Sequence, residues 1–251
     1  MDSKQRFSNR VENYLRYRPS YPPAVVDALV EITGLTPDWT VADLGSGTGI
    51  SSRPFLEHGN RVTGIEPNAE MRQAGDELLG DFACFRSVNG SAEETGLADA
   101  SVDLVLAGQA FHWFDQNATR RECLRILRGE KWAALLWNVR LADTDAFARG
   151  YEELLERFGT DYTEYRSRRI DPDELAAFFG TMPLERRMSN EQVFDFDGLR
   201  GRHLSASYAP RSGHPNHMPM MEELRRLFEE HASDGRVRFD YDTQVFVSRI
   251  G

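Results

Sequence analysis

Three glycines at alternate positions follow an apolar run near the start of the chain. The run Val41-Ala42-Asp43-Leu44 leads directly into Gly45, Gly47 and Gly49. Glycine has no Cβ, so such a loop can turn tightly between a strand and a helix, and its backbone can approach a flat ligand. Ile50 stands where a dinucleotide fingerprint has its third glycine, and the Lys-Ser or Lys-Thr pair of a P-loop is missing. The loop therefore predicts a nucleoside site of another kind.

Two acidic side chains indicate which nucleoside this loop would bind. Asp43, directly before the glycines, would repel a pyrophosphate and attract a positively charged amino group. Glu66 ends the next predicted strand, where an acidic side chain can accept hydrogen bonds from both hydroxyls of a ribose. We therefore expect a nucleoside cofactor that carries an amino acid.

Residues after the later predicted strands could carry out the chemistry. His112 follows the fourth strand among the aromatic side chains of Phe111, Trp113 and Phe114. It is the candidate general base, and packing beside the cofactor is the alternative role for it. Arg140, beyond the fifth strand, could hold an acidic acceptor in the fork of its guanidinium group, or could lie on the surface.

Two segments outside the sheet pattern supply further candidates. Tyr17 and Arg18 could close over the cofactor as part of a lid, or could only pack on the sheet. Glycine and prolines in residues 203–217 predict a structured loop, in which Tyr208 and Arg211 could contact the acceptor. The histidines of this loop lack the spacing of metal ligands, so no metal site is expected.

The spacing of apolar residues predicts how these side chains are positioned. Strand-like runs alternate with helical ones, which indicates parallel strands joined by crossovers in a doubly wound α/β sheet. Two late runs would pair antiparallel at the edge of this sheet. We expect helices at 24–33, 51–58, 69–79, 117–127, 144–157, 171–179 and 220–232, and strands at 40–44, 61–65, 83–88, 102–107, 132–137, 184–196 and 236–250.

The same pattern divides the chain into four segments. Residues 1–23 form an N-terminal arm or lid, and residues 24–142 form the cofactor-binding core. No strand separates the two helices of residues 143–183, which are expected to be a helical insertion or cap near the acceptor site. Residues 184–251 complete the sheet.

Composition narrows the classes of partner. The chain has 251 residues and a formal net charge of -10, which suits a single α/β protein and opposes binding to a nucleic acid. Its 2 cysteines lack metal-ligand spacing, and no apolar run resembles a signal peptide or is long enough to cross a bilayer. We expect a cytoplasmic monomer or homodimer that binds a small-molecule acceptor, and neither nucleic acid nor a membrane.

The motifs resemble those of the class I S-adenosylmethionine-dependent methyltransferases. Asp43 to Gly49 is similar to the family's first motif and Gly64 to Asn68 to its second. Ser91 to Glu93 resembles the segment that frames the adenine, and Asp103 to Gln109 resembles the fourth strand. The resemblance implies a Rossmann-like, mostly parallel seven-stranded sheet, S-adenosylmethionine as the cofactor, and Glu66 as the ligand of its ribose.

A further resemblance, to type 11 methyltransferase domains similar to trans-aconitate methyltransferases, covers nearly the whole chain. It rests on Tyr14 to Pro22, Ala110 to Asp115, Trp137-Asn138 and Ser205 to Pro210. One departure is Arg128 to Lys131, where the family usually has a Pro-Gly-Gly turn before the fifth strand.

These observations predict a methyl transfer to a small acceptor at an oxygen atom, with a carboxylate as one such acceptor. A carboxylate is already ionised and needs orienting cations, whereas a hydroxyl benefits from a base such as His112. The alternative is a catalytically silent module that binds S-adenosylmethionine and regulates a partner. The acceptor would be bound by Trp113, Arg140, Tyr208 and Arg211, and the cofactor by Tyr17, Arg18, Asp43, Gly45, Ser46, Gly47, Gly49, Glu66, Pro67, Met71, Ser91, Ala92, Glu93, Gly108 and Gln109.

Overall fold

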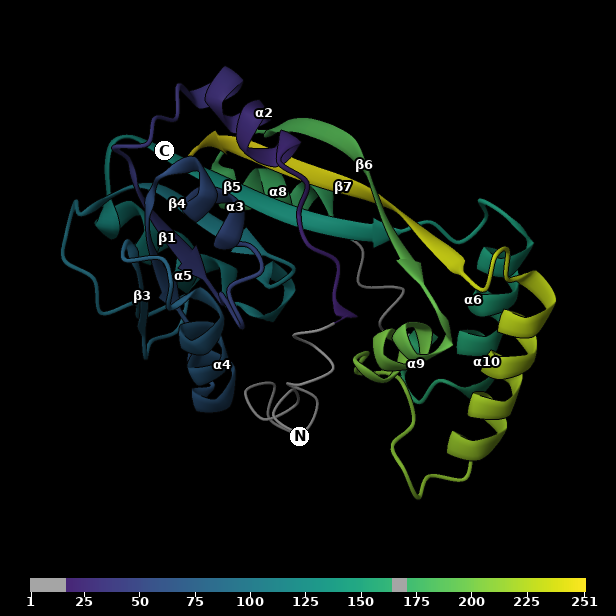
Figure 1. The fold of residues 1–251 in the computed structure, drawn as a ribbon. Helices are drawn as coiled ribbons and strands as arrows, with labels where there is room; N and C mark the ends of the chain where they lie inside the picture. The colour runs from purple at the N-terminus through teal and green to yellow at the C-terminus, as the bar shows by residue number, and fades with distance from the viewer. Residues whose placement is uncertain (1–16, 164–170) are drawn as a thin grey trace.

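A seven-stranded sheet in the order β3-β2-β1-β4-β5-β7-β6 organises the molecule. The structure is a computed structural model, which describes residues 17–163 and 171–251 (Figure 1). The strands are β1 Thr40–Leu44, β2 Arg61–Ile65, β3 Phe85–Val88, β4 Val102–Gly108, β5 Leu127–Arg140, β6 Leu184–Phe194 and β7 Val237–Arg249. The helices are α2 Ala24–Thr33, α3 Arg53–His58, α4 Ala69–Leu79, α5 Gln116–Ile126, α6 Ala146–Phe158, α8 Pro172–Phe179, α9 Phe196–Leu204 and α10 His217–His231, with a 3-10 turn at Phe111–Trp113.

Strand direction brings the predicted site residues to one edge of the sheet. β1 pairs in parallel with β2 and with β4, and β4 pairs in parallel with β5. β7 lies antiparallel between β5 and β6. The carboxyl ends of β1, β2, β4 and β5 therefore point the same way, and open α/β sheets bind their ligands at such an edge. The predicted doubly wound, mostly parallel fold is confirmed.

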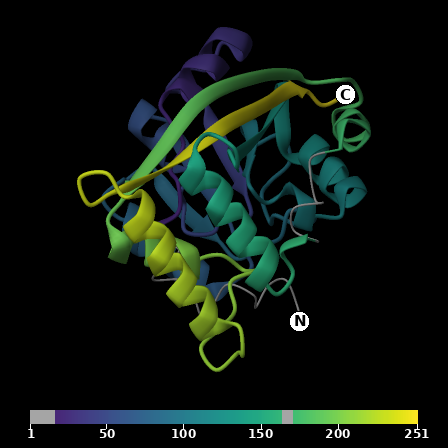
Figure 2. The ribbon, with the colours of Figure 1, turned by 90° about the vertical axis from the view of Figure 1, so that its right-hand side faces the viewer.

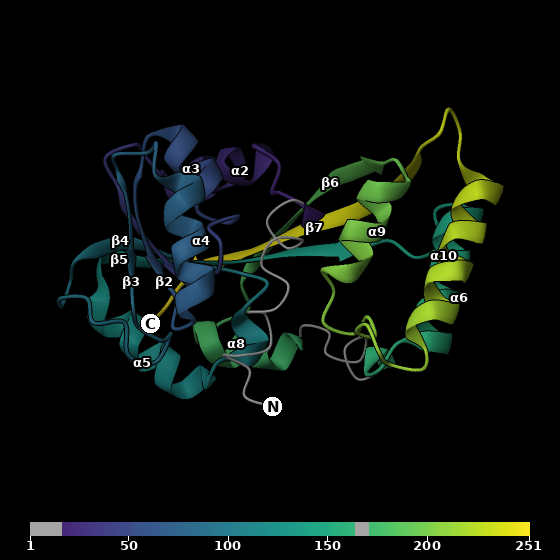
Figure 3. The same cartoon turned by 60° about the horizontal axis from the view of Figure 1, so that its bottom comes forward.

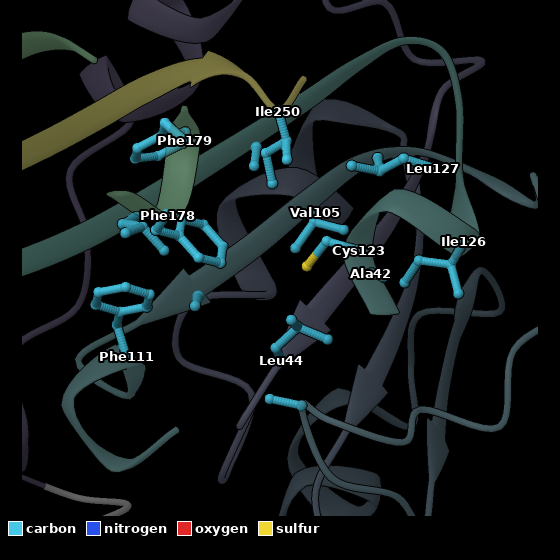
Figure 4. Close-up of a cluster of buried hydrophobic side chains, with 14 of the residues drawn as sticks. Ala42, Leu44, Val105, Phe111, Cys123, Ile126, Leu127, Phe178, Phe179 and Ile250 are labelled. Carbon is cyan, nitrogen blue, oxygen red and sulfur yellow. The ribbon is translucent and has the colours of Figure 1, made fainter. Parts of the chain in front are cut away.

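Helices cover both faces of the sheet, and the parallel strands are apolar on both sides for that reason. Leu104 and Leu106 of β4 pack in the cluster that α2 and α3 cover, whereas Val105 packs in the opposite cluster with α5 and α8. Figure 3 shows α2 and α3 on one side of the sheet and α5 and α8 on the other. In the cluster covered by α5 and α8, Phe178 lies beside Phe111, with 4.8 Å between the ring centroids (Figure 4).

The last three strands of the sheet extend beyond this core. β5 has 14 residues and β7 has 13, whereas β1 has 5. Their outer ends carry α6, α9 and α10, and we call this assembly the helical lobe (Figures 1 and 2). Its apolar cluster includes Tyr151 of α6, Leu199 of α9, Leu224 of α10 and Phe239 of β7. The long strands therefore join two packed regions into one molecule.

Two local features differ from the expectations. α9 was not expected: it runs from the end of the predicted strand at Phe196 into the predicted loop at Leu204, and Asp195 caps it by accepting a hydrogen bond from the Gly198 amide. β5 begins five residues earlier than expected, at Leu127, and contains an irregularity in its pairing with β4. Gly129 and Lys131 have φ values of 59° and 56° there, so the unusual Arg128 to Lys131 sequence forms a distorted strand start instead of a Pro-Gly-Gly turn.

The four-segment division of the chain stays a prediction. The two helices of the expected insertion, residues 143–183, pack in different places, since α6 belongs to the helical lobe and α8 to the sheet core. Within the described ranges, no helix is both long enough and apolar enough to span a bilayer. The described side chains also include no cluster of three or more metal-ligating residues.

Glu122 of α5 anchors the segment that leads into β4. Its carboxylate accepts hydrogen bonds from the Thr95 amide at 2.8 Å and from Arg125 Nη2 at 2.7 Å. The Arg125 hydrogen bond holds the pKa of Glu122 at about 2, below the ordinary 4.5. The ionised form is therefore the one that the fold binds.

Replacing Glu122 with Gln should lower the free energy of unfolding by about 2 kcal/mol at pH 7, because Arg125 and Thr95 lose a charged acceptor. A lowered pKa contributes stability above pH 4.5 that is lost as the pH falls towards 2. The difference from the parent should therefore shrink at pH 3. Urea unfolding at both pH values measures it, with the exposed Glu94→Gln as the control. Equal stability of parent and Glu122→Gln at pH 7 would contradict the prediction.

Candidate active site

The loop between β1 and α3 depends on its three glycines. Gly45, Gly47 and Gly49 have φ values of 64°, 56° and 83°, a left-handed region that favours glycine. A Cβ on Gly45 would lie 2.9 Å from Ala110 Cβ, and one on Gly49 would lie 2.3 Å from Leu79 Cδ1. Larger residues would therefore strain the backbone and also separate this loop from β4 and α4.

Glu66 joins this loop to the end of β2. The Gly47 amide donates to Glu66 Oε2 at 2.9 Å, and the Asn68 amide donates to Oε1 at 2.8 Å. The residue is 9% exposed, and burial raises the pKa of its carboxyl. Each carboxylate oxygen can accept a further hydrogen bond, so the group can still bind two hydroxyls.

A first hollow, the Glu66 pocket, gathers most of the residues predicted to bind the cofactor. Residues from the ends of four neighbouring segments, after β1, β2, β3 and β4, line it, as the sheet topology requires. Those predicted to bind the cofactor are Gly45, Gly47, Glu66, Pro67, Met71, Ser91, Ala92, Glu93, Gly108 and Gln109. Trp113, predicted to bind the acceptor, also lines the pocket, as do Asn68, Ala110 and Phe114, which were not named as ligands.

A second hollow, the His112 pocket, adjoins the first. The two share Gly45, Gly108, Gln109 and Trp113. Its other lining residues are Arg18, Pro19, Tyr21, Ser46, Thr48, Ile50, Ser51, His112, Asn138 and Ser207. Of these, Arg18, Ser46 and His112 were predicted as site residues.

Gln109 lies at the junction of the two pockets in a strained conformation. Its φ is 55°, which is uncommon for a residue other than glycine. Its Nε2 donates to the Asn138 carbonyl at 2.8 Å, and its amide donates to the Leu136 carbonyl at 2.9 Å. β5 therefore holds the strained residue in place where the two pockets meet.

The described end of the N-terminal arm covers the His112 pocket. Ser20 O accepts hydrogen bonds from Asn138 Nδ2 at 3.1 Å and from Asn190 Nδ2 at 2.7 Å. Arg18 Nη2 donates to Ser205 O at 3.0 Å. These bonds fasten residues 18–20 to β5, β6 and the segment after α9, whereas the rest of the expected arm, residues 1–16, lies outside the described ranges.

Tyr17 is fixed by a glycine of α9. A Cβ on Gly201 would lie 2.0 Å from the Tyr17 ring, so only glycine leaves room for it. Gln192 Nε2 also donates to the Tyr17 carbonyl, at 3.1 Å. Tyr17 lines neither pocket, and its contact with the cofactor stays a prediction.

Asp43 lies behind the wall of the His112 pocket. Its side chain is fully buried, and Oδ2 accepts hydrogen bonds from Ser51 Oγ and Ser52 Oγ, both at 2.7 Å. Oδ1 is buried without a hydrogen-bond partner among the described residues. Burial raises the pKa of Asp43 from 3.8 to about 7. A nearby cationic group would favour the ionised form, which fits a ligand that carries an amino group.

The residues predicted to bind the acceptor lie in three different places. Trp113 lines both pockets. Arg140 and Tyr208 lie in the helical lobe, where Arg140 forms an ion pair with Glu152. Arg211 is exposed on the loop before α10. Only Trp113 of these lies beside His112, so the roles of the other three stay predictions.

Several polar residues of the two pockets were not named as ligands from the sequence. Asn138, the first polar residue after the apolar stretch of β5, was noted only in the Trp137-Asn138 resemblance and was given no role. Thr48 and Ser51 lie within or directly after the glycine loop, where any side chain is close to the ligand edge. Ser207 lies within the Ser205 to Pro210 resemblance but was given no role, and only the folding of the helical lobe brings it to the His112 pocket.

Comparison with known proteins identifies the fold and its enzyme class. Residues 42–135 match the family model of a methyltransferase domain. The chain contains a methyltransferase domain. The match covers the glycine loop, Glu66 and His112, and it confirms the predicted class, an S-adenosylmethionine-dependent methyltransferase, for this domain.

Individual relatives of the methyltransferase domain agree with this result. An uncharacterized methyltransferase of Mycobacterium tuberculosis is 36% identical over 172 residues, which are 68% of this chain and 66% of that protein. An uncharacterized methyltransferase of Schizosaccharomyces pombe is 32% identical over 135 residues, 53% of each chain. The matched segments therefore span less than two thirds of these relatives.

A solved structure from Anaeromyxobacter dehalogenans, provisionally assigned as a type II methyltransferase, resembles the whole methyltransferase fold. It has a TM-score of 0.67 and 24% identity, and the match covers 93% of this chain and 98% of that one. At this identity the likeness shows the fold alone.

The methyltransferase domain should lose stability between pH 4 and pH 7 because of Asp43. Its raised pKa means that the folded state keeps a proton which the unfolded chain releases above pH 3.8, so unfolding becomes easier as the pH rises to about 7. Asp43→Asn should remove a loss on the order of 3 kcal/mol. Urea unfolding at pH 5 and pH 8 measures it, with the exposed Asp38→Asn as the control. An equal pH dependence in parent and Asp43→Asn would rule out this role.

Proposed function

We propose that this chain transfers a methyl group from S-adenosylmethionine to an oxygen atom of a small-molecule acceptor. The single observation that supports this most is the pair of adjoining pockets that share Gly45, Gly108, Gln109 and Trp113. One pocket has the residues that suit a nucleoside, and the other has a histidine and several neutral hydrogen-bonding groups. A methyl group passing between two bound molecules must cross such a junction.

The chain's own residues fit the cofactor in three respects. Glu66 is held ready to accept hydrogen bonds from the ribose hydroxyls, because Gly47 and Asn68 fix both of its oxygens. The unpartnered Oδ1 of Asp43 suits a positively charged amino group. Ser91, Ala92 and Glu93 would frame the adenine in the Glu66 pocket. When bound, S-adenosylmethionine supplies an electrophilic methyl group on a sulfonium.

Alignment is the main task of the remaining residues. Transfer from a sulfonium is an in-line displacement, so acceptor and donor must be held in one geometry without competing water. Gln109 and Trp113 stand at the junction, and the segment 18–20 covers the His112 pocket. His112 would take the proton of an acceptor hydroxyl, whereas a carboxylate acceptor would need no base.

The charge of the His112 pocket supports an oxygen acceptor over an amine. Its described lining residues include Arg18 and His112 but no Asp, Glu or Lys. Such a lining suits a neutral or anionic acceptor. An acid is the acceptor class we favour, in keeping with the resemblance to trans-aconitate methyltransferases. The predicted cytoplasmic location and the monomeric or homodimeric state stay predictions.

The proposal is tested first by ligand-induced stabilisation and then by turnover. S-adenosylmethionine and S-adenosylhomocysteine should both raise the melting temperature of the full chain, since they bind the folded state. Release of S-adenosylhomocysteine is then measured with panels of small acids, phenols and amines. Stabilisation without turnover on any panel would favour the silent regulatory module instead, and no stabilisation would refute the cofactor assignment.

Glu66→Ala should weaken binding of S-adenosylhomocysteine by about 100-fold, because charged hydrogen bonds to both ribose hydroxyls are lost. Isothermal titration calorimetry measures the affinity. Glu66→Gln keeps the shape of the side chain and should lose less. The melting temperature of each variant without ligand shows whether the Gly47 loop remains folded. Parent-like affinity in a folded Glu66→Ala variant would disprove the ribose assignment.

His112→Ala should lower kcat by about 100-fold or more on a hydroxyl acceptor, because the general base is lost. Binding of S-adenosylhomocysteine should change little. His214→Ala, on the exposed loop before α10, is the matched control and should retain turnover. If His112→Ala turns over normally at saturating acceptor, His112 has a structural role alone.

A further inference from the structure

The helical lobe encloses two arginines beyond the pockets already described. Arg140 ends β5 with a side chain that is 10% exposed, and Arg202 of α9 is 5% exposed. Arg140 is paired across the strands with Tyr241 of β7, so the two side chains lie on one face of the sheet. Arg202 Nε donates to the hydroxyl of the same Tyr241 at 3.2 Å. Both guanidinium groups also lie near the buried phenol of Tyr151, since burial raises the pKa of that phenol and the charge of each guanidinium lowers it.

The described residues do not balance the charge of these arginines. Glu152 forms an ion pair with Arg140 and also accepts a hydrogen bond from Tyr162. No described carboxylate forms an ion pair with Arg202. Nη1 of Arg140 and Nη1 of Arg202 are both buried without a hydrogen-bond partner among the described residues. Among the described buried side chains of the lobe, Arg140 and Arg202 thus face one carboxylate, that of Glu152.

The tyrosines around the arginines do not supply the missing negative charge. Burial raises the pKa of Tyr151 and of Tyr162 above the ordinary value of 10. Both phenols therefore stay protonated at neutral pH and supply no negative charge, and their hydroxyls are already bonded to His203 and Glu152. Tyr151 also packs under Arg140, whose Cζ lies 4.8 Å from its ring centroid.

A buried guanidinium without a counter-charge destabilises the folded state. Arginine cannot remove this charge by losing its proton, because its pKa is too high. An anionic oxygen group is the chemistry that would satisfy these two buried, unpartnered N–H groups, because guanidinium forks match carboxylate and phosphate.

The arginine pair lies beside the His112 pocket. Asn138, which lines that pocket, and Arg140 are two residues apart on β5, so their side chains share a face about 6.6 Å apart along the strand. Ser207 lines the pocket too, and Tyr208 follows it and packs against Tyr162 in the lobe. A group bound between the arginines therefore belongs to a molecule that could reach the His112 pocket.

We propose that Arg140 and Arg202 form a binding site for an anionic group of the acceptor, a carboxylate or a phosphate, away from the atom that is methylated. The proposal rests on the proposed methyl transfer and defines the acceptor further. The acceptor is a small molecule with two ends, one reacting beside His112 and the other anchored in the helical lobe. Both Nη1 atoms are shielded from solvent, so binding of the anionic group requires a local opening of the lobe.

The test measures binding of two anions to the full chain saturated with S-adenosylhomocysteine. Succinate and inorganic phosphate are the probes, sodium chloride of equal ionic strength is the control, and the melting temperature is the readout. At least one probe should raise the melting temperature above the chloride control, and the more effective probe distinguishes a carboxylate from a phosphate. No rise with either probe would overturn the proposal.

Variants locate the effect in the lobe. Arg140→Gln and Arg202→Gln should each weaken binding of the effective probe by at least about 30-fold. Arg202→Lys keeps the charge but not the fork, and should retain part of the response. Arg226→Gln, in an exposed ion pair on α10, is the matched control and should respond like the parent. An unchanged response in both Gln variants would overturn the proposal.

The response to S-adenosylhomocysteine separates this proposal from the proposed function. A variant that is stabilised by S-adenosylhomocysteine is folded and retains its cofactor site, so its loss of anion binding reports on the lobe alone. If S-adenosylhomocysteine does not stabilise the parent chain, the proposed function is refuted. Anion binding is then measured on the chain without S-adenosylhomocysteine, and its result decides the anion site alone.

Discussion

The hydrogen bond from the Gly47 amide to the Glu66 carboxylate joins the two strand ends on which the candidate site depends. It forms only because Gly45, Gly47 and Gly49 adopt left-handed conformations that bring the loop after β1 against the end of β2. The same conformations allow contact with Ala110 and Leu79, which fixes the loop against β4 and α4. The backbone of the glycine loop thus lines the Glu66 pocket and also contacts the segment that carries His112.

Asn138 links the sheet core to the helical lobe through its hydrogen bonds. Its Oδ1 accepts hydrogen bonds from Thr243 and Asn190, and its Nδ2 donates to Ser20. Its own carbonyl accepts from Gln109. A single buried residue therefore ties β5, β6, β7, the arm and the strained junction together. Because every polar atom of this side chain is engaged, the arrangement is more specific than apolar packing alone would make it.

The sheet core could be predicted from the sequence because its signals are local. The apolar runs of β1, β2 and β4 are buried on both faces, and Asn68 caps α4 through two backbone amides directly after Glu66. The helical lobe could be predicted only in part. α9 contains Gly198 and Gly201, which weaken a helical pattern, yet Gly201 is needed for the contact with Tyr17. The Arg140–Glu152 pair joins the consecutive elements β5 and α6, whereas the burial of Arg202 depends on the distant strand β7.

The molecule places opposite charges in its two regions. Burial raises the pKa values of the acids of the sheet core, Asp43 and Glu66. That of Asp43 is about 7, so Asp43 can lose its proton when a cationic ligand binds beside it. The arginines of the lobe have no such freedom, since guanidinium stays charged at any accessible pH. A cationic ligand in the core can therefore bind with release of a proton, whereas the lobe must meet its anion with a fixed charge. Ligand binding in the sheet core can therefore depend on pH, whereas anion binding in the lobe depends on the fixed charge of the arginines.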